Sequence, residues 1–153
     1  MQLDTVTYPD AEVADFLAQH FVPVKLDIRT ATDVAKRLKV SWTPTIVLRD
    51  AQGEERHRFV GFLPPAEFIA HLTLGLGKSD FERENFAAAA DRFAAVVRGC
   101  PSCEAAPEAQ YYVGVAKYKQ TKDVAPLKEE WKKLTEKYGS SDWAKKASFV
   151  FQK

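Results

Sequence analysis

The chain has 153 residues, enough for one ordinary domain or two small ones, and 46% of them are hydrophobic. It carries 22 basic and 21 acidic residues, a formal net charge of +1, so its charge gives no reason to expect nucleic acid or an acidic membrane surface as a partner. No apolar run approaches the ~20 residues of a membrane span, and the N-terminus MQLDTVTYPD has neither the basic nor the apolar part of a secretory signal. We therefore expect a cytoplasmic protein without a membrane-spanning segment.

The first half of the chain alternates helical and strand patterns. Asp10 stands as the N-cap of an amphipathic helix, because apolar residues recur after it at helical spacing. The segment 21–28 (FVPVKLDI) alternates and is rich in β-branched residues, which predicts a strand. A second helix is expected from Thr30, with Val40 near the end of its apolar side.

A hairpin and another helix are predicted next. Residues 45–50 (TIVLRD) favour a strand, and the following turn contains Gly53, which readily takes a positive φ. Residues 56–62 (RHRFVGF) then return as the antiparallel partner. Pro64 and Pro65 begin a helix that ends near the glycines of the sequence LGLGK.

The stretch VSWTPT, residues 40–45, places Pro44 after a short helix and directly before a strand. This arrangement resembles the cis-proline loop of the thioredoxin-like family, and the order of the elements resembles the C-terminal two-thirds of the thioredoxin fold. In that family the loop lies beside the catalytic cysteines and pairs with the substrate chain. The resemblance therefore implies that Trp42, Thr43 and Pro44 bind substrate. An ordinary loop proline in another α/β domain is the alternative.

The part of the family that carries the catalytic Cys-X-X-Cys has no counterpart here, since no cysteine precedes Pro44. The resemblance covers about half of the chain and omits the attacking thiolate, so we expect negligible disulfide reductase activity. The strands at 21–28 and 45–50 would also lack neighbours, and exposed strand edges invite pairing with another chain. We therefore expect either a homodimer that completes the sheet or a fragment of a longer protein.

Residues 78–153 contain helical patterns and no convincing strand. At a period of ~34 residues they resemble tetratricopeptide repeats, which are pairs of helices that bind proteins. The positions that carry this resemblance are Phe86, Ala89, Phe93, Pro101, Gly114, Ala116, Tyr118, Leu127, Trp131 and Leu134. A plain antiparallel helical bundle is the alternative, because the same apolar faces allow it. With Leu74, Leu76 and Gly77, the last helix of the first half could also serve as the first repeat helix.

Both cysteines stand in the tetrapeptide Cys100-Pro-Ser-Cys103, which follows a predicted helix ended by Gly99. A redox pair of this kind normally follows a strand and opens a helix, so we favour an inter-helix loop. An accessory dithiol, and a metal shared between two chains, are the alternatives. The three histidines, His20, His57 and His71, show no metal-ligand spacing, and we expect no cofactor or bound metal.

Taken together, the sequence predicts an α/β thioredoxin-like domain over residues 1–77, incomplete and completed by dimerisation. An all-α helical-repeat segment follows over residues 78–153. The predicted function is that of a relative of thiol–disulfide oxidoreductases that lacks the catalytic Cys-X-X-Cys and binds protein or peptide partners. The alternatives are a non-catalytic tetratricopeptide-type scaffold and redox activity through Cys100 and Cys103, so whether the chain is an enzyme stays open.

Overall fold

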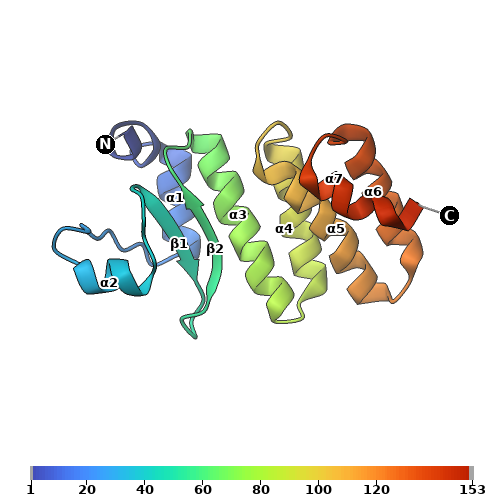
Figure 1. Ribbon diagram of the computed structural model, residues 1–153, viewed down its shortest axis with the longest axis horizontal. Helices are drawn as coiled ribbons and strands as arrows, with labels where there is room; N and C mark the ends of the chain where they lie inside the picture. Colours follow the sequence, from blue (N-terminus) through green and yellow to red (C-terminus); the bar gives the residue numbers. More distant parts are fainter. Residues whose placement is uncertain (1, 152–153) are drawn as a thin grey trace.

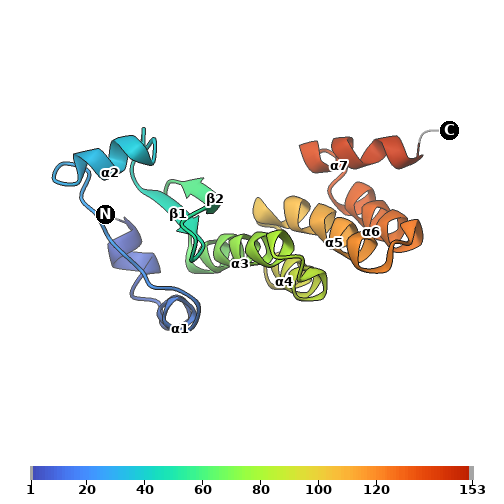
Figure 2. The same cartoon turned by 90° about the horizontal axis from the view of Figure 1, so that it is seen from below.

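The computed structural model describes residues 2–151. Its elements are η1 (Leu3–Thr7), α1 (Ala11–His20), α2 (Thr32–Arg37), β1 (Thr45–Arg49), β2 (Glu55–Val60), α3 (Pro65–Glu82), α4 (Phe86–Gly99), α5 (Ala105–Thr121), α6 (Val124–Lys137), α7 (Asp142–Ala147) and η2 (Ser148–Phe151). The molecule is elongated, with the hairpin, α1 and α2 at one end and α5 to α7 at the other, while α3 and α4 lie between them (Figure 1). In the turned view α7 lies across α5 and α6 (Figure 2).

Helix α1 begins where the sequence predicts, because Asp10 caps it. The Asp10 carboxylate accepts hydrogen bonds from the backbone N–H groups of Glu12 and Val13, at 3.0 and 3.1 Å. Val13 is buried in a core that α1 shares with η1, the hairpin and the first turns of α3. The π-helical turn η1 is not predicted; the Thr7 hydroxyl there donates to the Leu63 carbonyl oxygen at 2.6 Å and ties the turn to the start of α3.

The predicted strand at residues 21–28 is wrong. The only sheet among residues 2–151 has two strands, β1 and β2, and neither of them pairs with residues 21–28. Phe21 packs against the core, but the apolar side chains after it are exposed, with Val22 92% and Val24 73% exposed. An alternating apolar pattern forms a strand only beside another strand, because its backbone groups need partners. The second predicted helix is also shorter than expected, since α2 covers only six residues.

The predicted hairpin is confirmed. β1 and β2 are antiparallel, with Thr45 opposite Val60 and Leu48 opposite His57, and an irregularity follows Leu48. Gly53 in the connecting turn has a φ of +83°, which glycine adopts without steric cost. The hairpin packs against α3 through the buried side chains of Leu48 and Phe59.

Helix α3 is longer than the sequence suggests, because it does not stop at its glycines. The boundary predicted after residue 77 lies inside this helix, which the two halves of the chain share. Gly75 is in close contact with Leu48 of β1, and a Cβ at Gly77 would lie 2.6 Å from Cε1 of Phe93 in α4. The glycines are therefore places where neighbouring elements approach α3 closely.

The helices predicted for the second half are confirmed, and each packs against its neighbour in the chain. One core joins α3, α4 and α5 around Phe93, and another joins α5, α6 and α7 around Trp131. Polar caps begin two of these helices: Asp123 accepts from the N–H of Ala125 at 2.9 Å, and Ser141 accepts from the N–H of Ala144 at 3.1 Å.

Candidate functional site

The loop that leads into β1 presents a tryptophan to solvent. The peptide bond between Thr43 and Pro44 is cis. The Thr45 hydroxyl donates to the Trp42 carbonyl oxygen at 2.6 Å, and the N–H of Gly61 donates to the Pro44 carbonyl oxygen at 2.8 Å, which holds the loop against the end of β2. Trp42 is 70% exposed, an unusual position for a large aromatic side chain. Trp42, Thr43 and Pro44 thus form one surface feature.

This loop continues into a strand edge without a partner. β1 pairs with β2 on one side only, so its other edge faces no strand among residues 2–151. The exposed apolar side chains of residues 21–28 and of the loop belong to the same half of the molecule. An edge of this kind can hydrogen-bond an extended chain, with apolar side chains available beside it.

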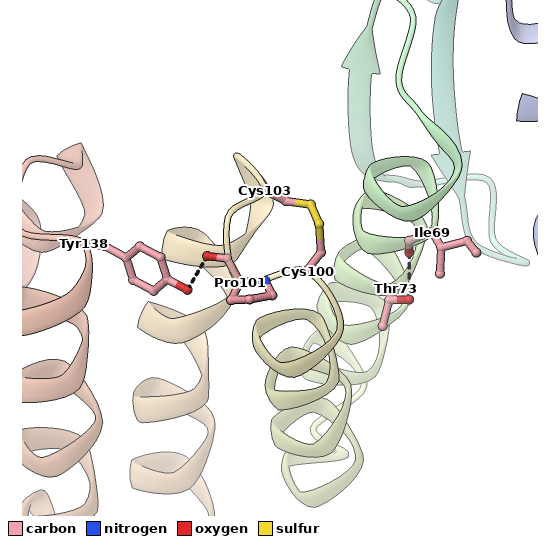
Figure 3. The surroundings of a disulfide bond; sticks show 6 residues. All are labelled: Ile69, Thr73, Cys100, Pro101, Cys103 and Tyr138. Atoms are coloured by element: carbon pink, nitrogen blue, oxygen red, sulfur yellow. Dashed lines mark hydrogen bonds between the residues drawn. A yellow bond between two sulfur atoms is a disulfide. The ribbon is translucent and has the colours of Figure 1, made fainter. Parts of the chain in front are cut away.

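Cys100 and Cys103 lie in the connection between α4 and α5, and their Sγ atoms are joined in a disulfide, with the Cα atoms 5.4 Å apart (Figure 3). Cys103 is buried at 5% exposure in the core that contains Ala70 of α3, and Cys100 packs against the same core. The Tyr138 hydroxyl donates to the Pro101 carbonyl oxygen at 2.8 Å and ties the connection to the end of α6. The predicted inter-helix position is therefore confirmed, and within it the cysteines are bonded to each other.

The structure does not bring the two sets of predicted site residues together. The hairpin and its Trp42–Pro44 loop lie on one side of α3, and α4 with the cysteine connection lies on the other (Figure 1). No hydrogen bond or core contact within residues 2–151 joins Cys100 or Cys103 to this loop. Chemistry at the sulfurs and binding at the loop are thus separate possibilities.

The structure reveals a buried polar cluster that the sequence analysis misses. The Nε2 atom of His57 in β2 lies 3.0 Å from Nδ1 of His71 in α3, with the rings stacked, and both side chains are less than 10% exposed. Lys78 Nζ lies 3.1 Å from Nδ1 of His57 and 2.6 Å from a carboxylate oxygen of Glu108 in α5. The cluster therefore connects the hairpin to the helical half. Two patterns could have revealed it, since His57 alternates with buried Phe59 and His71 lies on the buried face of α3.

The contacts determine where the protons of the cluster lie. A lysine ammonium only donates, so Nδ1 of His57 accepts and its proton is on Nε2. This N–H donates to Nδ1 of His71, which places the proton of His71 on its Nε2. Burial, followed by the positive charge of Lys78, lowers the pKa of His57 from 6.5 to about 3. Burial also lowers the pKa of His71, although Glu104, Glu108 and Glu67 oppose the change. Both rings are neutral at neutral pH.

Residues 2–151 contain no group of three or more histidine, cysteine or acidic side chains arranged to hold a metal ion. The histidine pair lacks a third ligand, and the cysteines are bonded to each other. Within the same residues, none of the helices combines the length and the apolar character that a membrane crossing requires.

Comparison with known proteins bears on the first half of the chain. Residues 2–75 match the family described as a thioredoxin-like domain. A curated relative, the thioredoxin of Mycoplasma pneumoniae, is 40% identical over 45 residues, which make up 29% of this chain and 43% of the relative. The chain thus matches less than half the length of that relative. No solved structure matches the chain. Residues 2–75 therefore constitute a thioredoxin-like domain.

Proposed function

We propose that this chain binds other polypeptides in an extended conformation along the free edge of β1, beside Trp42, Thr43 and Pro44. The observation that carries the proposal is the exposure of Trp42 next to an unpaired strand edge. Backbone hydrogen bonds along the edge would supply affinity, and the tryptophan would supply an apolar anchor. The cysteines at 100 and 103 lie in another connection, so binding at this loop does not involve their sulfurs.

Binding can be tested with carboxymethylated insulin B chain, a disulfide-free polypeptide. We expect saturable binding, a shift of tryptophan emission to shorter wavelength as Trp42 is buried, and slower hydrogen exchange of the β1 amides. Trp42→Ala should weaken binding at least tenfold, in the range of an aromatic hot spot. Phe149→Ala, which removes an exposed aromatic ring at the other end of the molecule, is the control. Equal affinity of the two variants, or no saturable binding, would contradict the proposal.

For the free chain we propose a second copy as the partner, through the same edge. Residues 21–28 support this, because their exposed apolar side chains would be covered in a dimer. Light scattering at micromolar concentration should give twice the chain mass of 17.2 kDa. Val22→Lys combined with Val24→Lys should give the mass of one chain. A stable monomer of the unmodified protein would show that this edge does not self-associate.

The helical half is proposed to be tetratricopeptide-like. The same packing contact recurs in the pairs α3–α4 and α5–α6, because in each pair an aromatic ring of the second helix packs against a glycine of the first. Gly77 meets Phe93, and a Cβ at Gly114 would lie 2.9 Å from Cδ1 of Trp131. The two glycines are about 37 positions apart, close to the 34-residue period of such repeats. This recurrence favours two structural repeats over an unrelated bundle, and it makes a protein-interaction scaffold the second reading of this half.

The disulfide favours one further candidate, thiol–disulfide exchange at Cys100 and Cys103. In such a reaction the two thiols would pass two electrons to a substrate disulfide, whose sulfurs leave as thiols while the Sγ–Sγ bond closes. Burial of Cys103 opposes this activity, and we expect insulin reduction with dithiothreitol to proceed at the rate of the reagent alone. Clear catalysis that disappears in Cys100→Ser would establish a redox function instead.

A further inference from the structure

A pocket of about 320 Å³ lies at the opposite end of β1 from the Trp42–Pro44 loop. Its walls come from the end of α1, the turn of the hairpin, α3 and α4, so residues far apart in the sequence meet there. Leu48, Phe21 and Leu76 give it an apolar part, and the bare backbone of Gly75 allows Leu48 to sit against α3. Small-molecule sites in proteins are typically concave and apolar, with a few polar groups that fix the ligand.

The charged groups around this pocket are mostly basic. They are Arg49, Arg56, Arg83 and Arg92, and the lining contains two carboxylates, those of Asp50 and Asp80. Each carboxylate holds one guanidinium group: Arg56 Nη2 lies 2.7 Å from Asp50, and Arg92 Nε lies 2.6 Å from Asp80. A guanidinium group has five N–H donors, so each pair leaves donors for a further acceptor while fixing the position of the arginine.

Two of the arginines have no ion-pair partner at close range. Among residues 2–151, neither Arg49 nor Arg83 forms an ion pair; Arg49 Nε donates to the carbonyl oxygen of Gly53 at 2.7 Å. Two carboxylates outside the lining also act on the group. Glu82 lies 3.7 Å from Arg56 Nη1 with a side chain that is 57% exposed, and Glu55, opposite Arg49 in the hairpin, interacts with Arg49 electrostatically while it is ion-paired with Arg58. With Glu55 and its partner Arg58 included, five guanidinium groups face four carboxylates, and the group keeps an excess of positive charge.

We propose that this pocket binds small organic phosphates. The apolar part would take the organic group, and the arginines would take the phosphate, whose oxygens match the planar geometry of guanidinium donors. A phosphate monoester carries up to two negative charges, which suits two arginines without a close ion-pair partner better than a monocarboxylate does. This site is independent of polypeptide binding at the β1 edge, and either can fail without the other.

Phenyl phosphate is the probe, added to the ¹⁵N-labelled protein at low ionic strength while amide shifts are followed by NMR. We expect saturable shifts for residues around the pocket and a dissociation constant several-fold lower than for inorganic phosphate, because the ring uses the apolar part. Benzoate, with the same ring and one charge, should bind at least tenfold more weakly. Benzoate binding as tightly as phenyl phosphate would overturn the assignment to phosphates.

The site is located by substitution. Arg49→Gln combined with Arg83→Gln should raise the dissociation constant at least tenfold; both side chains are exposed, so the fold should persist, which the dispersion of the spectrum checks. Arg29→Gln is the matched control, because Arg29 is an exposed arginine paired with Asp27 outside the pocket. The control should leave the constant within twofold of the original. No saturable binding, or equal affinity of the double variant and the control, would overturn the proposal.

Discussion

Acidification from pH 7.5 to pH 5 should destabilise the protein through the buried histidines. His57 is neutral in the folded protein, because its Nδ1 atom accepts from Lys78 and protonation there would set two positive charges against each other. Its pKa is about 3 when folded and 6.5 when unfolded. Below pH 6.5 the unfolded chain therefore binds a proton that the folded protein does not, and the free energy of unfolding falls as the pH falls.

The size of this effect follows from those two values. At pH 5 the folded imidazole is still neutral, so the loss is set by protonation of the unfolded chain over about 1.5 pH units. At ~1.4 kcal/mol per unit, His57 alone lowers the free energy of unfolding by about 2 kcal/mol. The lowered pKa of His71 acts in the same direction. The loss from His57 should continue until the pH reaches about 3, but carboxyl groups also titrate there, so the interval from 7.5 to 5 isolates the histidines.

Urea unfolding followed by far-ultraviolet circular dichroism at several pH values measures this dependence. His57→Gln combined with His71→Gln should flatten the free energy of unfolding over the interval, whatever the absolute stability of the variant. His20→Gln removes the exposed third histidine and should keep the slope that the cluster causes. A double variant with the same slope as the unmodified protein would refute the reasoning, because the pH dependence would then arise elsewhere.

Three further predictions concern a close helix contact, a helix cap and a buried carboxylate, and for each the free energy of unfolding in urea is measured. Gly77→Ala should lower the free energy of unfolding by about 1–3 kcal/mol, because the new Cβ would lie 2.6 Å from the ring of Phe93. Gly99→Ala is the control, since no atom lies within 4 Å of a Cβ there, and it should not destabilise the protein. Equal losses in the two variants would contradict the packing role of Gly77. Asp10→Ala should cost about 1 kcal/mol by leaving the first N–H groups of α1 without their cap, and an unchanged stability would show that the cap contributes nothing. Glu130→Gln should cost about 1–3 kcal/mol, since this buried carboxylate accepts from one amide and two lysines; a neutral effect would mean that its burial cancels those bonds.

The elements that could be predicted are those whose signals are local. Asp10 and the apolar spacing after it determine α1, and Gly53 with its flanking strands determines the hairpin. The failed strand at 21–28 shows the opposite case, because a strand depends on a neighbour that its own residues do not specify. The helix end predicted near Gly75 and Gly77 is wrong for a related reason: a glycine that ends a helix and one that admits a neighbouring side chain look the same in sequence.

The candidate site residues also fall into those that the sequence can predict and those that only the fold brings together. Trp42, Thr43 and Pro44 are adjacent in sequence, so their shared position could be inferred from a resemblance. His57, His71, Lys78 and Glu108 come from three different elements, and only the packing of β2 and α5 against α3 brings them together. The arginines around the pocket come from β1, β2, the residue after α3, and α4, so no spacing rule links them.

The pair Gly75 and Gly77 has a mechanical consequence for α3. Residues two apart on an α-helix are rotated by about 200° about its axis, so the two glycines lie on nearly opposite sides of α3. The side chain of Leu48 packs against Gly75, and the ring of Phe93 packs against Gly77. A rotation of α3 about its axis would disrupt the Leu48–Gly75 contact and the Phe93–Gly77 contact together. The two contacts therefore fix the rotational position of α3 between the hairpin and α4.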